Sequence, residues 1–178
     1  MIDSAKLSNP KDKEWLGIWA IPKEEECRHI IEIKNNINHK LQGPKFPLHI
    51  TLTGAFVLTH KELITLIPEI SSSIKPLKLT YKDYALDEYL FEAFYIPVLL
   101  STELKSMRSK LCSILNTNDN FYKPHMSLYY GKESSLKKNR ILTGLPSLEG
   151  ELNIDCLYIV SFNTMNFTSK ILNKILLN

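Results

Sequence analysis

Two segments of the chain each carry a histidine and a hydroxyl residue two positions apart. His49 precedes Thr51, and His125 precedes Ser127. Alternate side chains of a β-strand point to the same face, so each imidazole should lie beside its hydroxyl, roughly 6–7 Å away along the backbone. A hydroxyl and an imidazole that face one cavity can together hold a phosphate oxygen and move a proton. Two such pairs around one phosphoryl group therefore indicate cleavage of a phosphodiester.

The surroundings of the two pairs also repeat. Apolar residues occupy the intervening positions, a proline precedes each histidine (Pro47 and Pro124), and a glycine follows soon after (Gly54 and Gly131). The alternative to a catalytic role is that His49 and His125 are half-buried strand residues that bond only to the backbone. A zinc site is a second alternative, but neither motif brings the third ligand that zinc normally needs. We therefore expect catalytic histidines, no metal and no cofactor.

The elements that must position these pairs follow from hydrophobic periodicity and turn signals. The pattern predicts helices at 22–43, 59–73, 101–115 and 134–142. It predicts strands at 15–21, 48–53, 77–85, 90–98, 125–131 and 151–162, with 77–85 and 90–98 joined as a hairpin. The tail at 168–177 fits a helix or a last strand equally well. The order strand, helix, histidine-bearing strand occurs near 15–54 and again near 90–131, which indicates two related lobes.

The composition is that of one globular domain. The chain has 178 residues, of which 44% are hydrophobic and 23% charged, and its formal net charge is +3. These values argue against a disordered, fibrous or membrane-spanning protein and fall short of a surface that coats nucleic acid. We expect a loose lead-in at 1–13 and a single two-lobed domain at 14–178. Three scattered cysteines and no visible signal peptide favour the cytoplasm. Nothing indicates a membrane or an obligate protein partner, so we expect a monomer.

Three segments of the sequence resemble the two-histidine (2H) phosphoesterases, and among them most closely the small 2′,3′-cyclic nucleotide phosphodiesterases. These segments are 19–22, which begins with Trp19-Ala20, and the two histidine motifs with their flanks at 43–55 and 124–131. The resemblance spans residues 15–165. It implies an α+β fold in which two antiparallel sheets, flanked by helices, form two pseudo-symmetric lobes around a central groove.

The resemblance also implies roles for individual residues. His49 and His125 would be catalytic, Thr51 and Ser127 would bind phosphate oxygens, and Tyr130 would contact the substrate. The alternation of the strand disagrees with the last of these roles, because it points Tyr130 away from His125 unless a β-bulge before the next glycine redirects it.

Two further aromatic residues are candidates for substrate binding. Trp19 and Tyr129 lie in predicted strands, and an aromatic ring there can stack on a nucleobase. Packing in the core or against a neighbouring strand is the alternative for both residues.

The reaction implied needs one imidazole as base and one as acid. The neutral ring takes a proton from the attacking water, and the protonated ring donates to the departing sugar oxygen. From the sequence we assign the base to His125 and the acid to His49. The expected substrate is a 2′,3′-cyclic nucleotide or an RNA-end cyclic phosphate, opened to a 2′-phosphate in RNA processing or nucleotide metabolism. The alternatives are a phosphodiesterase for 2′–5′-linked or cyclic oligonucleotide signals and a non-catalytic RNA-end-binding module.

Overall fold

The computed structural model describes residues 14–118, 120–163 and 167–178. The lead-in expected at 1–13 lies outside the described residues. The helices are α1 (Glu24–Leu41), α2 (His60–Ser73), α3 (Thr102–Ile114) and α4 (Ser135–Leu142). The strands are β1 (Glu14–Ala20), β2 (Ile50–Thr51), β3 (Phe56–Leu58), β4 (Leu77–Lys82), β5 (Ala85–Leu86), β6 (Phe94–Pro97), β7 (His125–Tyr129), β8 (Glu149–Ile154), β9 (Cys156–Asn163) and β10 (Thr168–Leu176).

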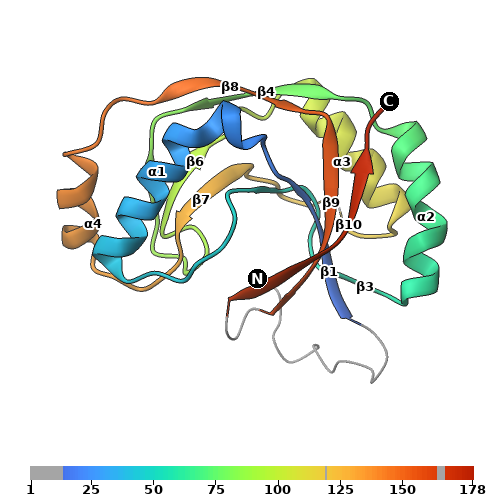
Figure 1. The fold of residues 1–178 in the computed structure, drawn as a ribbon, viewed down its shortest axis with the longest axis horizontal. Coiled ribbons are helices and arrows are strands. Elements are labelled where there is room, and N and C mark those ends of the chain that lie inside the picture. Colours follow the sequence, from blue (N-terminus) through green and yellow to red (C-terminus); the bar gives the residue numbers. More distant parts are fainter. Residues whose placement is uncertain (1–13, 119, 164–166) are drawn as a thin grey trace.

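These strands form two antiparallel sheets. The larger sheet has the order β10-β9-β1-β2-β7-β6-β5, with β3 paired to β1, and the smaller sheet is β4-β8. Helices α1 and α4 lie at the left of the molecule in Figure 1, and α2 and α3 lie at the right. The expected α+β architecture of antiparallel sheets flanked by helices is therefore confirmed.

The predicted repeat of strand, helix and histidine-bearing strand is present as β1-α1-β2 and β6-α3-β7. The two copies share a sheet, because β2 pairs with β7 through Ile50 and Met126. Both of these side chains are fully buried in one hydrophobic core, together with Ile18, Ile96 and Leu111. His49 directly precedes β2 and His125 begins β7, so the two histidines lie on neighbouring chain segments at the centre of the fold.

Local sequence signals explain where the helices begin. Thr59 and Glu62 form the predicted capping box at the start of α2, each side chain bonding to the other residue's backbone N–H. Ser101 caps α3 by accepting a hydrogen bond from the backbone N–H of Leu104. The first turn of α1 carries three glutamates, which interact favourably with the positive end of the helix dipole.

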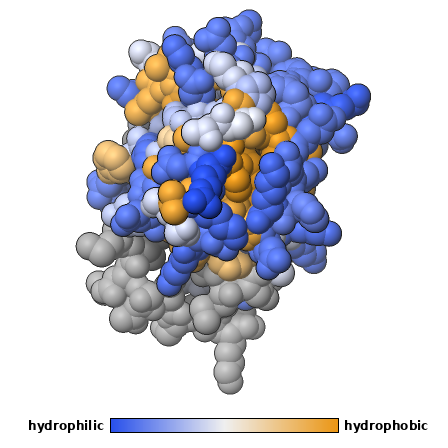
Figure 2. Space-filling model, turned by 90° about the vertical axis from the view of Figure 1, so that its left-hand side faces the viewer, coloured by the Kyte–Doolittle hydropathy of each residue, from blue (hydrophilic) through white to orange (hydrophobic). Residues whose placement is uncertain are grey.

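The surface that carries α1 and α4 is mixed in polarity. On this side of the molecule, polar regions flank a strip of apolar surface (Figure 2).

The cysteines of the described chain, Cys27, Cys112 and Cys156, are buried and free, as expected of packing residues. No helix within the described ranges is long and apolar enough to cross a bilayer.

Three predictions about strands need correction or completion. The hairpin expected between 77–85 and 90–98 is present in part, because β5 pairs with β6 and Tyr81 forms an antiparallel bridge with Val98. The longer partner of β4 is β8, which the prediction did not include. The strand expected at 151–162 is two strands in different sheets, separated at Asp155. The tail is a strand, β10, that pairs along β9. Each outcome depends on pairing with distant residues, which local periodicity does not report.

Candidate active site

The register between β2 and β7 brings the two histidine motifs together. Ile50 lies opposite Met126 in this antiparallel pair. One step to either side, His49 is therefore opposite Ser127, and Thr51 is opposite His125. Residues directly opposite each other point to the same face of a sheet, so all four side chains share one face. The convergence that the sequence predicts is present in the structure.

Both imidazoles are held by the same backbone contact. Nδ1 of His49 lies 2.8 Å from the carbonyl oxygen of Pro47, and Nδ1 of His125 lies 2.8 Å from that of Lys123. A carbonyl only accepts hydrogen bonds, so each Nδ1 carries the proton. Nε2 of each ring is then the nitrogen left for a ligand, as an acceptor when the ring is neutral and as a donor when it is charged.

The two rings differ in their surroundings. His49 is only 5% exposed, and its imidazole stacks on the indole of Trp19 with a centroid distance of 3.6 Å and an interplanar angle of 12°. His125 is half-buried, and the ring of Tyr95 meets it edge-on at 5.3 Å. One imidazole is thus enclosed by protein, while the other is partly open to solvent.

This difference sets the charge of His49. Burial above all, together with the charges of His125 and Lys34, lowers the pKa of His49 to about 4. The hydrogen bond to Pro47 opposes these effects without overcoming them. A histidine with such a low pKa is neutral at physiological pH. The electrostatic interaction between His49 and His125 also indicates that the two rings lie close to each other.

The two hydroxyl residues also differ. Thr51 is exposed, and its hydroxyl makes no hydrogen bond to any residue that the structure describes. Ser127 is 2% exposed, and its Oγ donates to the carbonyl oxygen of Phe91 at 2.9 Å. The hydroxyl of Thr51 is free to bind a ligand. The hydroxyl of Ser127 must first give up its hydrogen bond to the carbonyl oxygen of Phe91 before it can donate to a ligand.

Comparisons with known proteins agree with this geometry. The sequence model of the 2′-5′ RNA ligase superfamily matches residues 22–164, which include both histidine motifs. The chain belongs to this superfamily. Its members are phosphoesterases, and the predicted 2H phosphoesterase relationship is confirmed. No curated protein matches the chain.

Solved structures of similar fold include proteins from two bacteria. LigT of E. coli in complex with 3′-AMP superposes with a TM-score of 0.67 at 13% identity, covering 93% of this chain and 99% of LigT. Its apo form gives a TM-score of 0.64 at 14% identity, covering 94% and 99%. TT0787 of Thermus thermophilus gives 0.62 at 13% identity, covering 92% and 97%. At these identities the similarity establishes the fold.

In this member of the superfamily, a β-bulge decides which tyrosine faces the site. Phe94 pairs with Tyr129, but Tyr95 pairs with Ser127, so Leu128 is an extra residue on β7. The bulge turns Tyr129 into the core, where it is 4% exposed, contrary to strict alternation. It turns Tyr130 back toward the histidine face, where its hydroxyl is hydrogen bonded to Ser127 and burial raises its pKa to about 12.

The predicted aromatic residues therefore have different surroundings. Tyr129 packs inside the protein against Gly43 and Gly131, where an added Cβ would collide with its ring. Trp19 is 7% exposed, with one face covered by His49, so its visible role is to enclose that imidazole. Tyr130 lies beside the site, in agreement with the family's pattern.

Sequence reasoning missed two aromatic residues next to the histidines. Phe46 stacks on Tyr130 with a centroid distance of 3.9 Å and meets His49 edge-on at 6.2 Å. Tyr95 lies directly opposite Ser127 and contacts His125. Phe46 lies only three residues before His49, so its place near this histidine could have been predicted from the sequence. The place of Tyr95 could not, because it depends on the register between β6 and β7.

Metal binding has no obvious ligand set in this region. Among the residues that the structure describes, no group of three or more histidine, cysteine, aspartate or glutamate side chains is arranged to hold a metal ion.

Proposed function

We propose that this protein hydrolyses a cyclic phosphodiester, opening the 2′,3′-cyclic phosphate of a ribonucleotide or of an RNA end to a 2′-phosphate. The observation that carries the proposal is the register of β2 and β7, which puts two imidazoles and two hydroxyls on one face. Matching backbone contacts leave Nε2 of both imidazoles available. Membership of a superfamily of phosphoesterases supports the same class of chemistry.

The environments of the rings favour His49 as the base, the reverse of the assignment made from the sequence. Neutral His49 accepts a proton at Nε2 from water as the water oxygen forms its bond to phosphorus. Protonated His125 donates from Nε2 to the 3′ oxygen as the P–O3′ bond breaks. The hydroxyls of Thr51 and Ser127 donate to the non-bridging oxygens, where negative charge increases in the transition state. The products are the free 3′ hydroxyl and a 2′-phosphate.

The substrate itself would adjust the proton affinity of the base. A phosphate anion between the rings stabilises the charged form of His49, so it raises the pKa of this imidazole. For His49, which is neutral in the free protein because of burial, this makes proton transfer from water more favourable. The rate should depend on pH in a bell shape, since one ring must be neutral and the other charged.

Product analysis with a panel of substrates tests this proposal. We expect turnover of 2′,3′-cyclic nucleotides to nucleoside 2′-phosphates, and we expect EDTA to leave the rate unchanged because the imidazoles carry out the proton transfers. Mass spectrometry combined with ³¹P NMR identifies the position of the product phosphate. Loss of activity in EDTA would contradict the proposed chemistry. Cleavage of 2′–5′-linked dinucleotides or cyclic oligonucleotides in preference to 2′,3′-cyclic phosphates would contradict the proposed substrate.

A further inference from the structure

The face that bears the histidines continues across the sheet to its edge strand. Starting from His125 on β7, the directly opposite residues are Thr51 on β2, Trp19 on β1, Tyr158 on β9 and Lys174 on β10. Directly opposite residues share a face, so these five side chains form one line on the same side of the sheet. We refer to them as the cross-strand row.

The outer end of the cross-strand row offers an aromatic ring and a cation. Nζ of Lys174 lies 5.8 Å from the centroid of the Tyr158 ring, which confirms that the two side chains share a face. Tyr158 is half-buried and Lys174 is exposed. Among the described residues, no carboxylate pairs with Lys174. The charge of this lysine is therefore free to meet a ligand.

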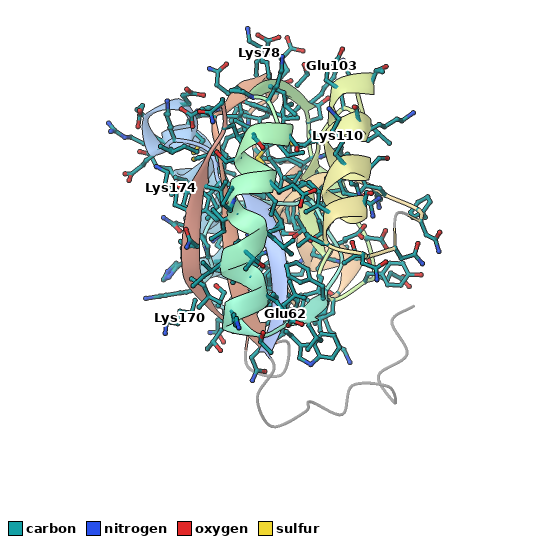
Figure 3. The ribbon with its side chains drawn as sticks, turned by 90° about the vertical axis from the view of Figure 1, so that its right-hand side faces the viewer. Glu62, Lys78, Glu103, Lys110, Lys170 and Lys174 are labelled. Carbon is teal, nitrogen blue, oxygen red and sulfur yellow. The ribbon has the colours of Figure 1, made fainter. Side chains whose placement is uncertain are left out.

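A second lysine on β10 lies on the opposite face. Lys170 pairs with Ser161, three residues along β9 from Tyr158, and residues three apart in a strand point to opposite faces. The register shift between Ile171 and Asn173 causes this, because without an extra residue Lys170 and Lys174 would share a face. Both lysines are exposed, and both are labelled along β10 in Figure 3. The chain thus contains a matched control for Lys174.

The spacing suits a chain of nucleotides. Neighbouring strands lie about 4.8 Å apart, so Tyr158 and Lys174 are roughly 10 and 14 Å across the sheet from Thr51. Proteins that bind single-stranded nucleic acid combine aromatic rings, on which bases stack, with cations along the phosphate backbone. The cross-strand row places both groups in line with His125.

We propose that the cross-strand row binds a single-stranded oligoribonucleotide, with a base stacked on Tyr158 and a backbone phosphate at Lys174. This inference rests on the proposed function, because the terminal cyclic phosphate must lie between His49 and His125. It specifies the substrate as an RNA end rather than a free mononucleotide. Groups beyond the reacting phosphate then contribute binding energy that a mononucleotide lacks.

Kinetics on two substrates test the proposal. We expect a higher kcat/KM for a short oligoribonucleotide ending in a 2′,3′-cyclic phosphate than for a 2′,3′-cyclic mononucleotide. Lys174→Gln should lower kcat/KM for the oligoribonucleotide up to roughly fivefold through KM, as expected for one exposed ion pair. Tyr158→Leu should lower it about tenfold by removing a stacked base. Neither change should affect the mononucleotide. Lys170→Gln should behave like the wild type on both substrates.

A binding measurement keeps this test independent of turnover. Fluorescence anisotropy with a labelled oligoribonucleotide ending in a 2′-phosphate should show weaker binding by Lys174→Gln than by Lys170→Gln, with a smaller dependence on salt. Equal affinities for these two variants, or equal kcat/KM of the wild type for the two substrates, would overturn the proposal. Absence of turnover on both substrates would count against the proposed function, while the binding result would still decide the role of the cross-strand row.

Discussion

Replacing His125 with alanine is expected to lower kcat/KM for a 2′,3′-cyclic nucleotide by about 10²–10⁴-fold, the usual contribution of general acid–base catalysis. The change removes the group that would protonate the departing 3′ oxygen. His125 is better suited to this test than His49, because it is half-buried, whereas His49 is enclosed against Trp19. Steady-state kinetics, with circular dichroism to confirm folding, provide the measurement.

The matched control for this variant is His39→Ala. His39 is an exposed histidine in the last turn of α1, so its loss should leave kcat/KM and the fold unchanged. A His125→Ala protein that is folded and keeps more than a tenth of the wild-type kcat/KM would contradict the acid role.

Replacing Thr51 with valine should lower kcat by about 10²–10³-fold, the loss typical when one donor to a developing oxyanion is removed. Valine keeps the shape and the β-branching of threonine, and the Thr51 side chain is exposed, so the fold should be unaffected. The structure gives the hydroxyl no partner among the described residues, which leaves phosphate binding as the function that the change removes. Kinetics and thermal unfolding together measure the effect.

Thr80→Val is the control for Thr51→Val. Thr80 is also an exposed threonine on a strand, but it lies on β4, in the smaller sheet and not in the sheet that carries the two motifs. Its replacement should change neither kcat nor the melting temperature. If Thr51→Val retained kcat within a factor of three of the wild type, Thr51 would not stabilise the transition state.

Ser127 is a less direct probe of phosphate binding, although its motif matches that of Thr51. Its hydroxyl is buried and donates to the carbonyl oxygen of Phe91. Ser127→Ala would therefore leave this carbonyl without its donor and cost about 1 kcal/mol of folding free energy, in addition to any effect on catalysis. The two hydroxyl positions, equivalent in sequence, are thus not equivalent in the folded protein.

The sequence contains enough information to predict the central pair of strands. In both motifs the apolar residues at alternate positions, such as Ile50 and Met126, have to be buried, and this fixes the face on which the histidines lie. The Thr59 capping box and the Ser101 cap are equally local, so the starts of α2 and α3 were predictable. These features depend on residues a few positions apart.

The features that the sequence does not reveal depend on long-range pairing. The partner of β4 is β8, about 70 residues away, and no local pattern distinguishes it from the nearby β6. The extra residue Leu128 on β7 exchanges the faces of Tyr129 and Tyr130, which strict alternation assigned the other way round. The enclosure of His49 by Trp19 also follows from the register of β1 with β2, and it determines which ring is neutral.

The central claim is that His49 and His125 act on one phosphoryl group. NMR titration of both imidazoles tests it most directly, because each ring gives a separate signal that reports its charge. In the free protein, His49 should remain neutral until the pH falls to about 4, since burial lowers its pKa. Adding a nucleoside 2′-phosphate should shift both signals with the same dissociation constant and raise the pKa of His49. Signals that respond with different dissociation constants, or a response from only one ring, would contradict the claim.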